Sequence, residues 1–130
     1  MKFVPVSNRE QAIVWTVLQL GLPEGFAHLT EYTDYVNTLM DEAEYDECYV
    51  VDDRGNYCAY FAWCYSADIH HKGSIFDVTN VVVKPGTNCA SKVWREIIKL
   101  AREYECEWLS RCSHEADGSI KNHFRRINHG

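Results

Sequence analysis

The sequence lacks several features that would place it in a specialised class of protein. It has no apolar run close to the roughly 20 residues that a membrane-spanning helix needs. Its start, MKFVPVSNRE, has no apolar core of a signal peptide, so we expect a cytoplasmic protein. Internal repeats, low-complexity stretches and linkers are also missing, while 46% of the residues are hydrophobic. These observations predict one compact domain over residues 1–130.

An excess of positive charge is missing too. The chain has 13 Lys and Arg against 19 Asp and Glu, which gives a formal net charge of -6. This balance disfavours binding along a nucleic-acid backbone. Only the end, KNHFRRINHG, is locally basic, and we interpret it as a solvated helix face. Tyr32, Tyr35 and Tyr45 are candidates either for a helix core or for an interface with a protein partner or a second copy of the chain.

Close cysteine pairs at zinc-ribbon spacing are absent, although the chain has six cysteines. Most of them lie in apolar, strand-like runs, so we expect reduced thiols packed in the core. Cys89 differs because it precedes a predicted helix, where a thiol can become more reactive. His70, His71 and Asp68 lack ligand spacing on a defined element. The sequence therefore predicts no metal site.

The strongest local pattern covers residues 74–105, SIFDVTNVVVKPGTNCASKVWREIIKLAREYE. Its β-branched and aromatic residues predict a strand over 74–83, which Pro85 ends because proline cannot continue the ladder. Apolar residues at helical spacing then predict a helix over 89–104, with Asn88 or Ser91 as its N-cap. Since the N-terminus of a helix points free amides and a positive dipole outward, this junction is suited to phosphate.

The rest of the chain divides into further strand-like and helical segments. We predict strands over 2–6, 47–51, 56–65 and 106–112, and helices over 7–20, 30–43 and 118–127. Ser7 and Glu10 form a possible capping box. Segment 56–65 is apolar on both faces, which is typical of a central strand, and the turn at 52–55 predicts a hairpin before it. The expected order is β-α-α-β-β-β-α-β-α.

This order resembles the GNAT acyltransferase superfamily, including small acetyltransferase-like proteins of tailed bacteriophages. The likeness is concentrated in NVVVKPG and ASKVWREIIKLAREYECEW, which look like the family's fourth strand, its cofactor-loop helix and its fifth strand. The resemblance implies an α/β (α+β) fold with a mixed, mostly antiparallel central sheet and helices on both faces. It also implies acetyl-CoA as the cofactor. The pantetheine arm would enter a splay between the fourth and fifth strands, and the pyrophosphate would lie against the loop.

Site residues follow from the resemblance. The residues implied to bind the cofactor are Val81, Val82, Val83, Thr87, Asn88, Cys89, Ala90 and Ser91. Asp77 is a candidate base, or else a solvent-facing strand residue or a hydrogen-bonded turn partner. Glu115 and His114 are alternative bases. Many family members protonate the leaving thiolate with a tyrosine of the last helix. The corresponding residue here is Phe124, so His123 or Ser119 would have to donate instead.

The chain also departs from the family. The loop PGTNCASK is shorter than the family's signature and has only Gly86 and Ala90 as small residues. The family's closing β-hairpin is not expected, which would leave the fifth strand with an open edge that a partner covers. Two functions stay open: an acetyl-CoA-dependent N-acetyltransferase acting on an unknown amine, or a catalytically inactive GNAT-fold bacteriophage protein. The second would act in the virion or in protein interaction, and the first in the host cytoplasm.

Overall fold

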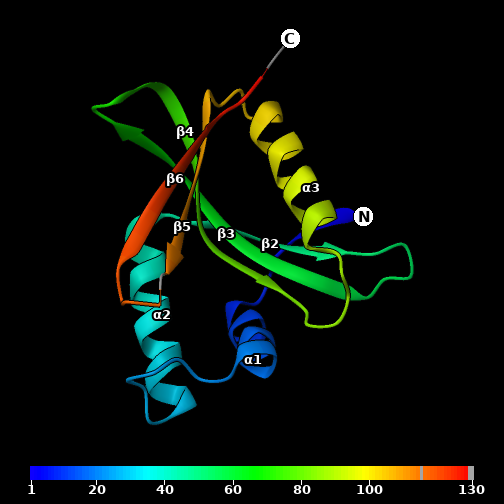
Figure 1. Cartoon of the computed structure of the whole chain (residues 1–130). Helices are drawn as coiled ribbons and strands as arrows, with labels where there is room; N and C mark the ends of the chain where they lie inside the picture. The colour runs from blue at the N-terminus through cyan, green and yellow to red at the C-terminus, as the bar shows by residue number, and fades with distance from the viewer. Residues whose placement is uncertain (115, 129–130) are drawn as a thin grey trace.

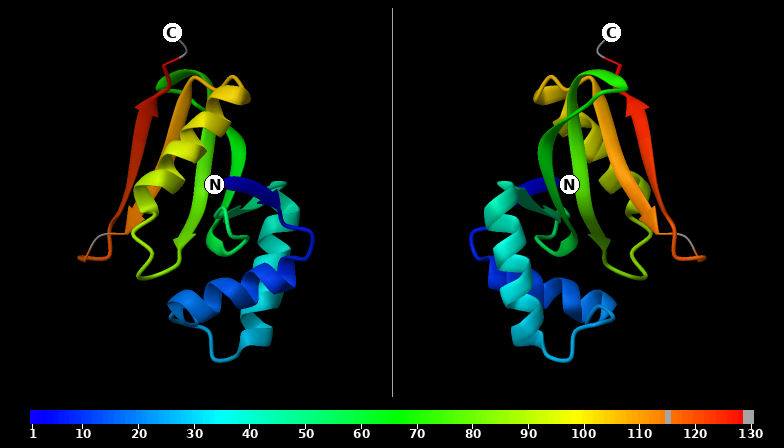
Figure 2. Two further views of the ribbon diagram at one scale, coloured as in Figure 1. Left: turned by 90° about the vertical axis from the view of Figure 1, so that its right-hand side faces the viewer. Right: turned by 90° about the vertical axis from the view of Figure 1, so that its left-hand side faces the viewer.

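One six-stranded sheet forms the centre of the computed structural model, which describes residues 1–114 and 116–128. The elements are β1 (Lys2–Pro5), α1 (Arg9–Leu20), α2 (Leu29–Ala43), β2 (Asp46–Val51), β3 (Tyr57–Asp68), β4 (His71–Val83), α3 (Ala90–Glu103), β5 (Trp108–His114) and β6 (Ile120–Arg126). The strands lie in chain order, and every pair is antiparallel except β4–β5. Helix α3 lies on one face of the sheet, and α1 and α2 lie on the other (Figures 1 and 2). No described helix is long and apolar enough to cross a membrane.

β3 is the central strand that the sequence predicts. Six consecutive residues, from Cys58 to Trp63, are buried, because α3 covers one face and α1 with α2 covers the other. On the α3 face, Trp63 stacks on Phe76 with ring centroids 4.1 Å apart. On the opposite face, Tyr60 packs with Met40 of α2. The hairpin predicted before this strand is confirmed by the antiparallel pairing of β2 with β3.

Helix α3 has the amphipathic pattern that the sequence predicts, but the N-caps predicted for α3 and for α1 are both wrong. Val93, Ile97 and Ala101 are buried against the sheet. The N-cap position of α3 is Cys89, whose side chain makes no capping hydrogen bond, rather than Asn88 or Ser91. In α1 the cap is Asn8 rather than Ser7, since its side chain accepts a hydrogen bond from the backbone N–H of Gln11.

The last segment is a strand, so the helix predicted over residues 118–127 is wrong. β6 pairs antiparallel with β5 along all seven of its residues. The apolar spacing of Ile120, Phe124 and Ile127 suits a helix, but the free edge of β5 binds this backbone and that pairing decides its structure. The open edge predicted for the fifth strand is therefore wrong as well. No second strand follows β6 in residues 116–128.

A buried carboxylate joins α1 to the sheet. Glu47 of β2 accepts a hydrogen bond from the Tyr60 hydroxyl at 2.7 Å and pairs with Arg9 Nε at 3.0 Å. The Glu47 side chain is 8% exposed, and Arg9 also reaches Asp41 of α2 at 2.7 Å. A buried carboxylate that keeps a cation and a hydroxyl as partners fixes the position of both helices on this face.

Cysteines form no disulfide among the described residues. Cys58, Cys89 and Cys106 are buried, as the sequence predicts for core thiols, but Cys48 and Cys64 are half-buried and Cys112 is exposed. Burial, with smaller contributions from Asp46 and Glu47, raises the pKa of Cys48 to about 11. The folded state therefore holds this proton more tightly than the unfolded chain, where a thiol has a pKa of about 8.5. The stabilisation that the protonated Cys48 thiol contributes is therefore fully present below about pH 8.5, and it is lost as the pH rises through about 11.

We expect the free energy of unfolding to fall between about pH 8.5 and about pH 11, and to fall less in a Cys48→Ala variant. Urea denaturation of both chains under reducing conditions, at about pH 8 and about pH 11, measures the two slopes. Equal slopes in the two chains would contradict the contribution of Cys48.

Candidate functional site

β4 and β5 separate part-way along their length. They pair in parallel from Ile75 opposite Trp108 to Val78 opposite Arg111. Beyond Val78, β4 continues to Val83 and β5 continues to His114, but no pair joins them among the described residues. The backbone of residues 79–83 therefore presents an unpaired edge toward β5. This is the splay that the sequence resemblance implies.

A β-bulge at Thr79 accounts for the separation. Asn80 lies opposite Ala62 of β3 and Val78 lies opposite Trp63, so Thr79 is one extra residue in β4. Its hydroxyl donates a hydrogen bond to the Ala62 carbonyl at 3.2 Å. A bulge bends the strand that carries it and increases the local twist. Because this one follows the last β4–β5 pair directly, it turns β4 away from β5.

The splay opens into a cavity of about 320 Å³ on the α3 face. Its lining residues are Val78, Thr79, Asn80, Val81, Val83, Trp94, Arg111 and Cys112. Val81 and Val83 pack against the core beneath α3. Val82 points to the opposite face, where it is buried beside Tyr60. Of the three predicted valines, two line the cavity with their side chains and one offers only its backbone.

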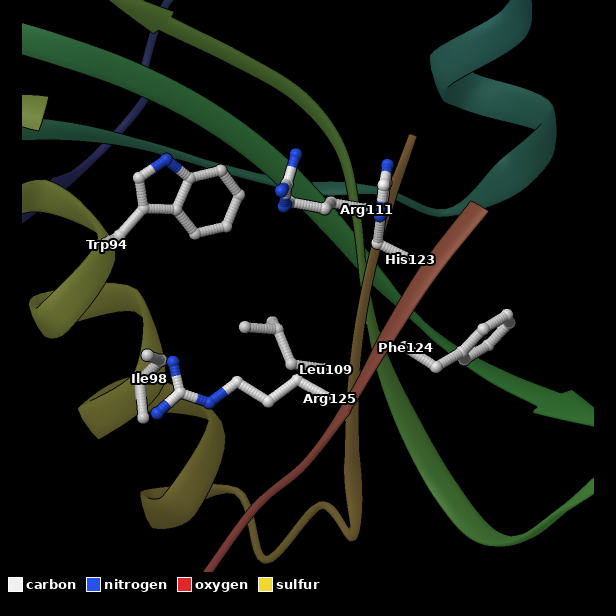
Figure 3. A pocket seen from close by; sticks show the side chains of 7 residues that line it. All are labelled: Trp94, Ile98, Leu109, Arg111, His123, Phe124 and Arg125. Carbon is white, nitrogen blue, oxygen red and sulfur yellow. The ribbon is translucent and has the colours of Figure 1, made fainter. Parts of the chain in front are cut away.

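A second cavity of about 410 Å³ adjoins the first and shares Trp94 and Arg111 with it. The Arg111 guanidinium lies over the Trp94 ring, 5.7 Å from its centroid, which is a cation–π contact. Figure 3 shows Arg111 and Arg125 reaching from β5 and β6 toward α3. The Phe124 ring points to the other side of the sheet, where it stacks on His71 with ring centroids 4.0 Å apart.

The loop before α3 offers backbone amides more than side chains. Gly86 and Asn88 adopt left-handed backbone angles, with φ of 81° and 51°. The Thr87 hydroxyl donates to the Lys84 carbonyl at 2.7 Å, and Cys89 is 6% exposed. These two predicted cofactor-binding side chains are thus engaged within the loop. Asn88, like residues 90 and 91, is exposed, and the first turn of α3 has no side-chain cap.

Asp77 and His123 lie on opposite faces of the sheet. Asp77 pairs with Ser110 of β5, and Ser110 pairs with Phe124 of β6. His123 pairs instead with Arg111. Paired residues share a face, whereas neighbours in a strand alternate. The structure therefore places Asp77 on the α1–α2 face and His123 on the α3 face, and it does not bring these two predicted catalytic residues together.

Asp77 is held at the closed end of the splay. It lies one residue before the last β4–β5 pair, and the buried Ser110 hydroxyl donates to its Oδ1 at 2.8 Å. Burial raises the pKa of the Cys64 thiol, and the nearby Asp77 carboxylate raises it further. The pKa of Tyr45 is raised by burial and, to a smaller extent, by Cys64 and Asp77. The Ser110 hydroxyl thus orients the Asp77 carboxylate, which lies on the face of the sheet opposite the cavities.

The other predicted catalytic positions differ from expectation. Phe124 lies in β6, so its alignment with a tyrosine of a last helix is wrong. His123 Nε2 lies 2.7 Å from the Ser113 hydroxyl, beside the second cavity. Ser119 donates to Asp117 at 2.6 Å in the turn before β6. Glu115 lies outside the described residues.

Three residues that line the cavities, Trp94, Arg111 and Arg125, are not among those predicted from the sequence. Trp94 fits the helical core pattern, and Arg125 fits a solvated helix face, so neither was expected in a site. Arg111 is the one with a usable signal, because it is the single basic residue in the predicted strand 106–112 of an acidic protein. Only the pairing of β5 with β6 brings Arg111 and Arg125 to the same face.

The chain is similar in sequence to a phage protein and in fold to several acetyltransferases. The chain is 43% identical over 129 residues to Protein 7 of Escherichia phage T7, covering 95% of this chain and 96% of that protein. A GNAT family acetyltransferase from Staphylococcus aureus superposes with a TM-score of 0.64 at 8% identity, covering 94% of this chain and 93% of that one. A predicted acetyltransferase from Clostridium acetobutylicum, solved with acetyl-CoA, superposes with a TM-score of 0.51 at 16% identity, and the match covers 83% of this chain and 77% of that one. No family model matches the chain. The predicted GNAT-like fold is confirmed.

Proposed function

Because the chain belongs to the family of Protein 7 of phage T7 and has the fold of GNAT acetyltransferases, we propose that it is an N-acetyltransferase. The reaction transfers the acetyl group of acetyl-CoA to an amine: the amine nitrogen bonds to the acetyl carbon, the thioester C–S bond breaks, and CoA is released as the free thiol with the proton that the amine loses. The observation that carries this proposal is the splay, with an unpaired backbone edge at 79–83 beside a cavity of about 320 Å³. The proposed setting is the host cytoplasm during infection.

The residues present fit such a cofactor. When bound, acetyl-CoA supplies an acyl group activated as a thioester. The unpaired edge of β4 is suited to pairing with the amide groups of an extended pantetheine arm, as a strand edge pairs with a peptide. Val81 and Val83 provide an apolar wall for that arm. The uncapped first turn of α3 presents amides and a positive dipole end to phosphate.

Asp77 is the proposed general base. Its carboxylate, oriented by the buried Ser110, lies at the closed end of the splay and faces α1 and α2. An amine that approaches from this face meets the carboxylate, which accepts its proton as the nitrogen becomes nucleophilic. Ser110 is a positioning residue, since its single hydrogen bond holds the carboxylate in place. The amine and the cofactor thus approach from opposite faces of the sheet.

Calorimetric titration with acetyl-CoA and with CoA tests the cofactor site. We expect micromolar binding by the natural chain and affinity at least about tenfold weaker in Ser91→Glu, because the added carboxylate repels phosphate at the first turn of α3. Ser7→Glu, an exposed position next to α1, is the matched control and should bind like the natural chain. Absence of binding at millimolar ligand would reject the proposal and favour the alternative of an inactive GNAT-fold phage protein that acts through protein contacts.

A further inference from the structure

Arg111 lies at the point where β4 and β5 separate. It is opposite Val78 in the last β4–β5 pair, and the pair just before it joins Asp77 to Ser110. Because neighbours in a strand alternate between the two faces of a sheet, Asp77 faces α1 and α2 while Arg111 faces α3. Two side chains of opposite charge therefore flank the closed end of the splay, one on each face of the sheet.

The Arg111 side chain extends across the α3 face and lines both cavities. Figure 3 shows it reaching from β5 toward Trp94 of α3, and its guanidinium lies 5.7 Å from the centroid of the indole ring. Such a cation–π contact supports one face of the guanidinium and leaves the N–H groups at its edge able to donate. No ion pair joins Arg111 to a carboxylate within residues 1–114 and 116–128. Since the side chain is exposed, a ligand in the splay has access to its charge.

The splay cavity, of about 320 Å³, contains one charged side chain. Of the described residues that line it, Arg111 alone carries a charge, while the others are apolar, like Val81, or neutral and polar, like Asn80. A ligand that fills the cavity excludes water, which strengthens the interaction of this charge with any negative charge on the ligand. Negative charge that develops in the splay is therefore stabilised by Arg111.

The proposed position of the cofactor brings its sulfur to this end of the splay. Its phosphates lie at the first turn of α3, and its pantetheine arm pairs with residues 79–83. The arm thus runs from Val83 toward Val78, and the thioester lies at the closed end. Because the amine approaches from the Asp77 face, the sulfur is on the α3 side of the acetyl carbon, which is the side that Arg111 occupies.

We infer that Arg111 is a catalytic residue that stabilises the thiolate leaving from acetyl-CoA, an inference that rests on the proposed function. The amine nitrogen bonds to the acetyl carbon as the C–S bond breaks, and the electron pair of that bond stays on the sulfur. Asp77 takes the proton that the amine loses and returns it to solvent. Arg111 keeps its own proton, since a guanidinium is not deprotonated in proteins. It holds the thiolate as an ion pair until the sulfur takes a proton from solvent.

Two measurements on the full chain test this inference: kcat for acetyl transfer to a panel of amines, and the ultraviolet absorbance of the thiolate in bound CoA. Arg111→Gln should lower kcat about tenfold to a hundredfold, the range for a hydrogen bond to a charged group. Affinity for acetyl-CoA should stay unchanged, because its thioester is uncharged. At about pH 8 the ratio of thiolate to thiol in bound CoA should be at least about tenfold lower in Arg111→Gln. Arg111→Lys keeps the charge and should retain most of both quantities.

Lys121→Gln is the matched control. Lys121 is exposed on β6 and lines neither cavity, so the same loss of charge there should change neither kcat nor the thiolate ratio. Circular dichroism melting checks that each variant is folded. If Arg111→Gln does not fold, Arg111→Met gives the same comparison, because its apolar side chain still packs on Trp94.

The outcomes separate this inference from the proposed function. Natural kcat and a natural thiolate ratio in Arg111→Gln would overturn the role of Arg111 and leave the transferase proposal intact. A lower kcat with an unchanged thiolate ratio would overturn it too, because Arg111 would then act on something other than the sulfur. If the natural chain raises the thiolate ratio through Arg111 but acetylates no amine, the contact with sulfur stands and the transferase proposal fails. A natural chain that does not bind CoA overturns both.

Discussion

Replacing Asp77 by asparagine is expected to lower kcat for acetyl transfer by about 10²- to 10⁴-fold, the range for loss of a general base. The amide keeps an oxygen that accepts the Ser110 hydrogen bond, so the local structure is retained. Affinity for acetyl-CoA should stay unchanged, because Asp77 faces α1 and α2 while the splay cavity lies on the α3 face. Steady-state kinetics with a panel of small amines and peptide α-amines, together with calorimetry, measures both quantities.

Asp53→Asn is the matched control for this experiment. Asp53 lies in the exposed turn between β2 and β3, so the same change of charge there should leave kcat unaltered. An Asp77→Asn variant with the natural kcat would remove Asp77 from the mechanism. A variant that loses acetyl-CoA binding instead would show that Asp77 supports the cofactor site rather than proton transfer.

Filling the splay should have the largest effect on cofactor binding. Val81→Trp places an indole in the cavity of about 320 Å³ between β4 and β5, where it competes with an extended ligand for the same volume. We expect affinity for both acetyl-CoA and S-acetyl-pantetheine to fall more than about a hundredfold. Calorimetry measures the loss, and thermal melting shows whether the sheet remains folded.

Val14→Trp serves as the control for added bulk, because Val14 is 42% exposed on α1, away from the α3 face. It should bind both ligands with natural affinity. If Val81→Trp does not fold, Val83→Trp places the same group in the same cavity. Natural affinity in a folded variant at either position would rule out the splay as the cofactor site.

Two elements show which local patterns are sufficient for prediction. Segment 56–65 is apolar on both faces, and such a segment avoids water only inside a sheet covered on both sides, which is where β3 lies. Residues 89–104 repeat apolar side chains at helical spacing, and α3 buries that stripe. Their order, with the strand-loop-helix unit at 74–105, was enough to predict the GNAT-like fold.

The end of the chain shows where local pattern fails. Ile120, Phe124 and Ile127 fit a helix, and the burial of β6 has no alternation that would reveal a strand. The edge of β5 supplies the backbone hydrogen bonds that decide the outcome. Because that edge comes from another segment, a local window of residues does not contain the information.

The sequence by itself determined the order of the first eight elements, the buried stripe of α3, the central strand and the candidate residues. The tertiary structure alone decided where the splay begins, because that depends on the Thr79 bulge and on where β4 and β5 stop pairing. It also decided which residues lie on the same face of the sheet. Strand register sends Asp77 to one face and joins Arg111 with Arg125 on the other, and register is a property of paired strands rather than of either strand alone.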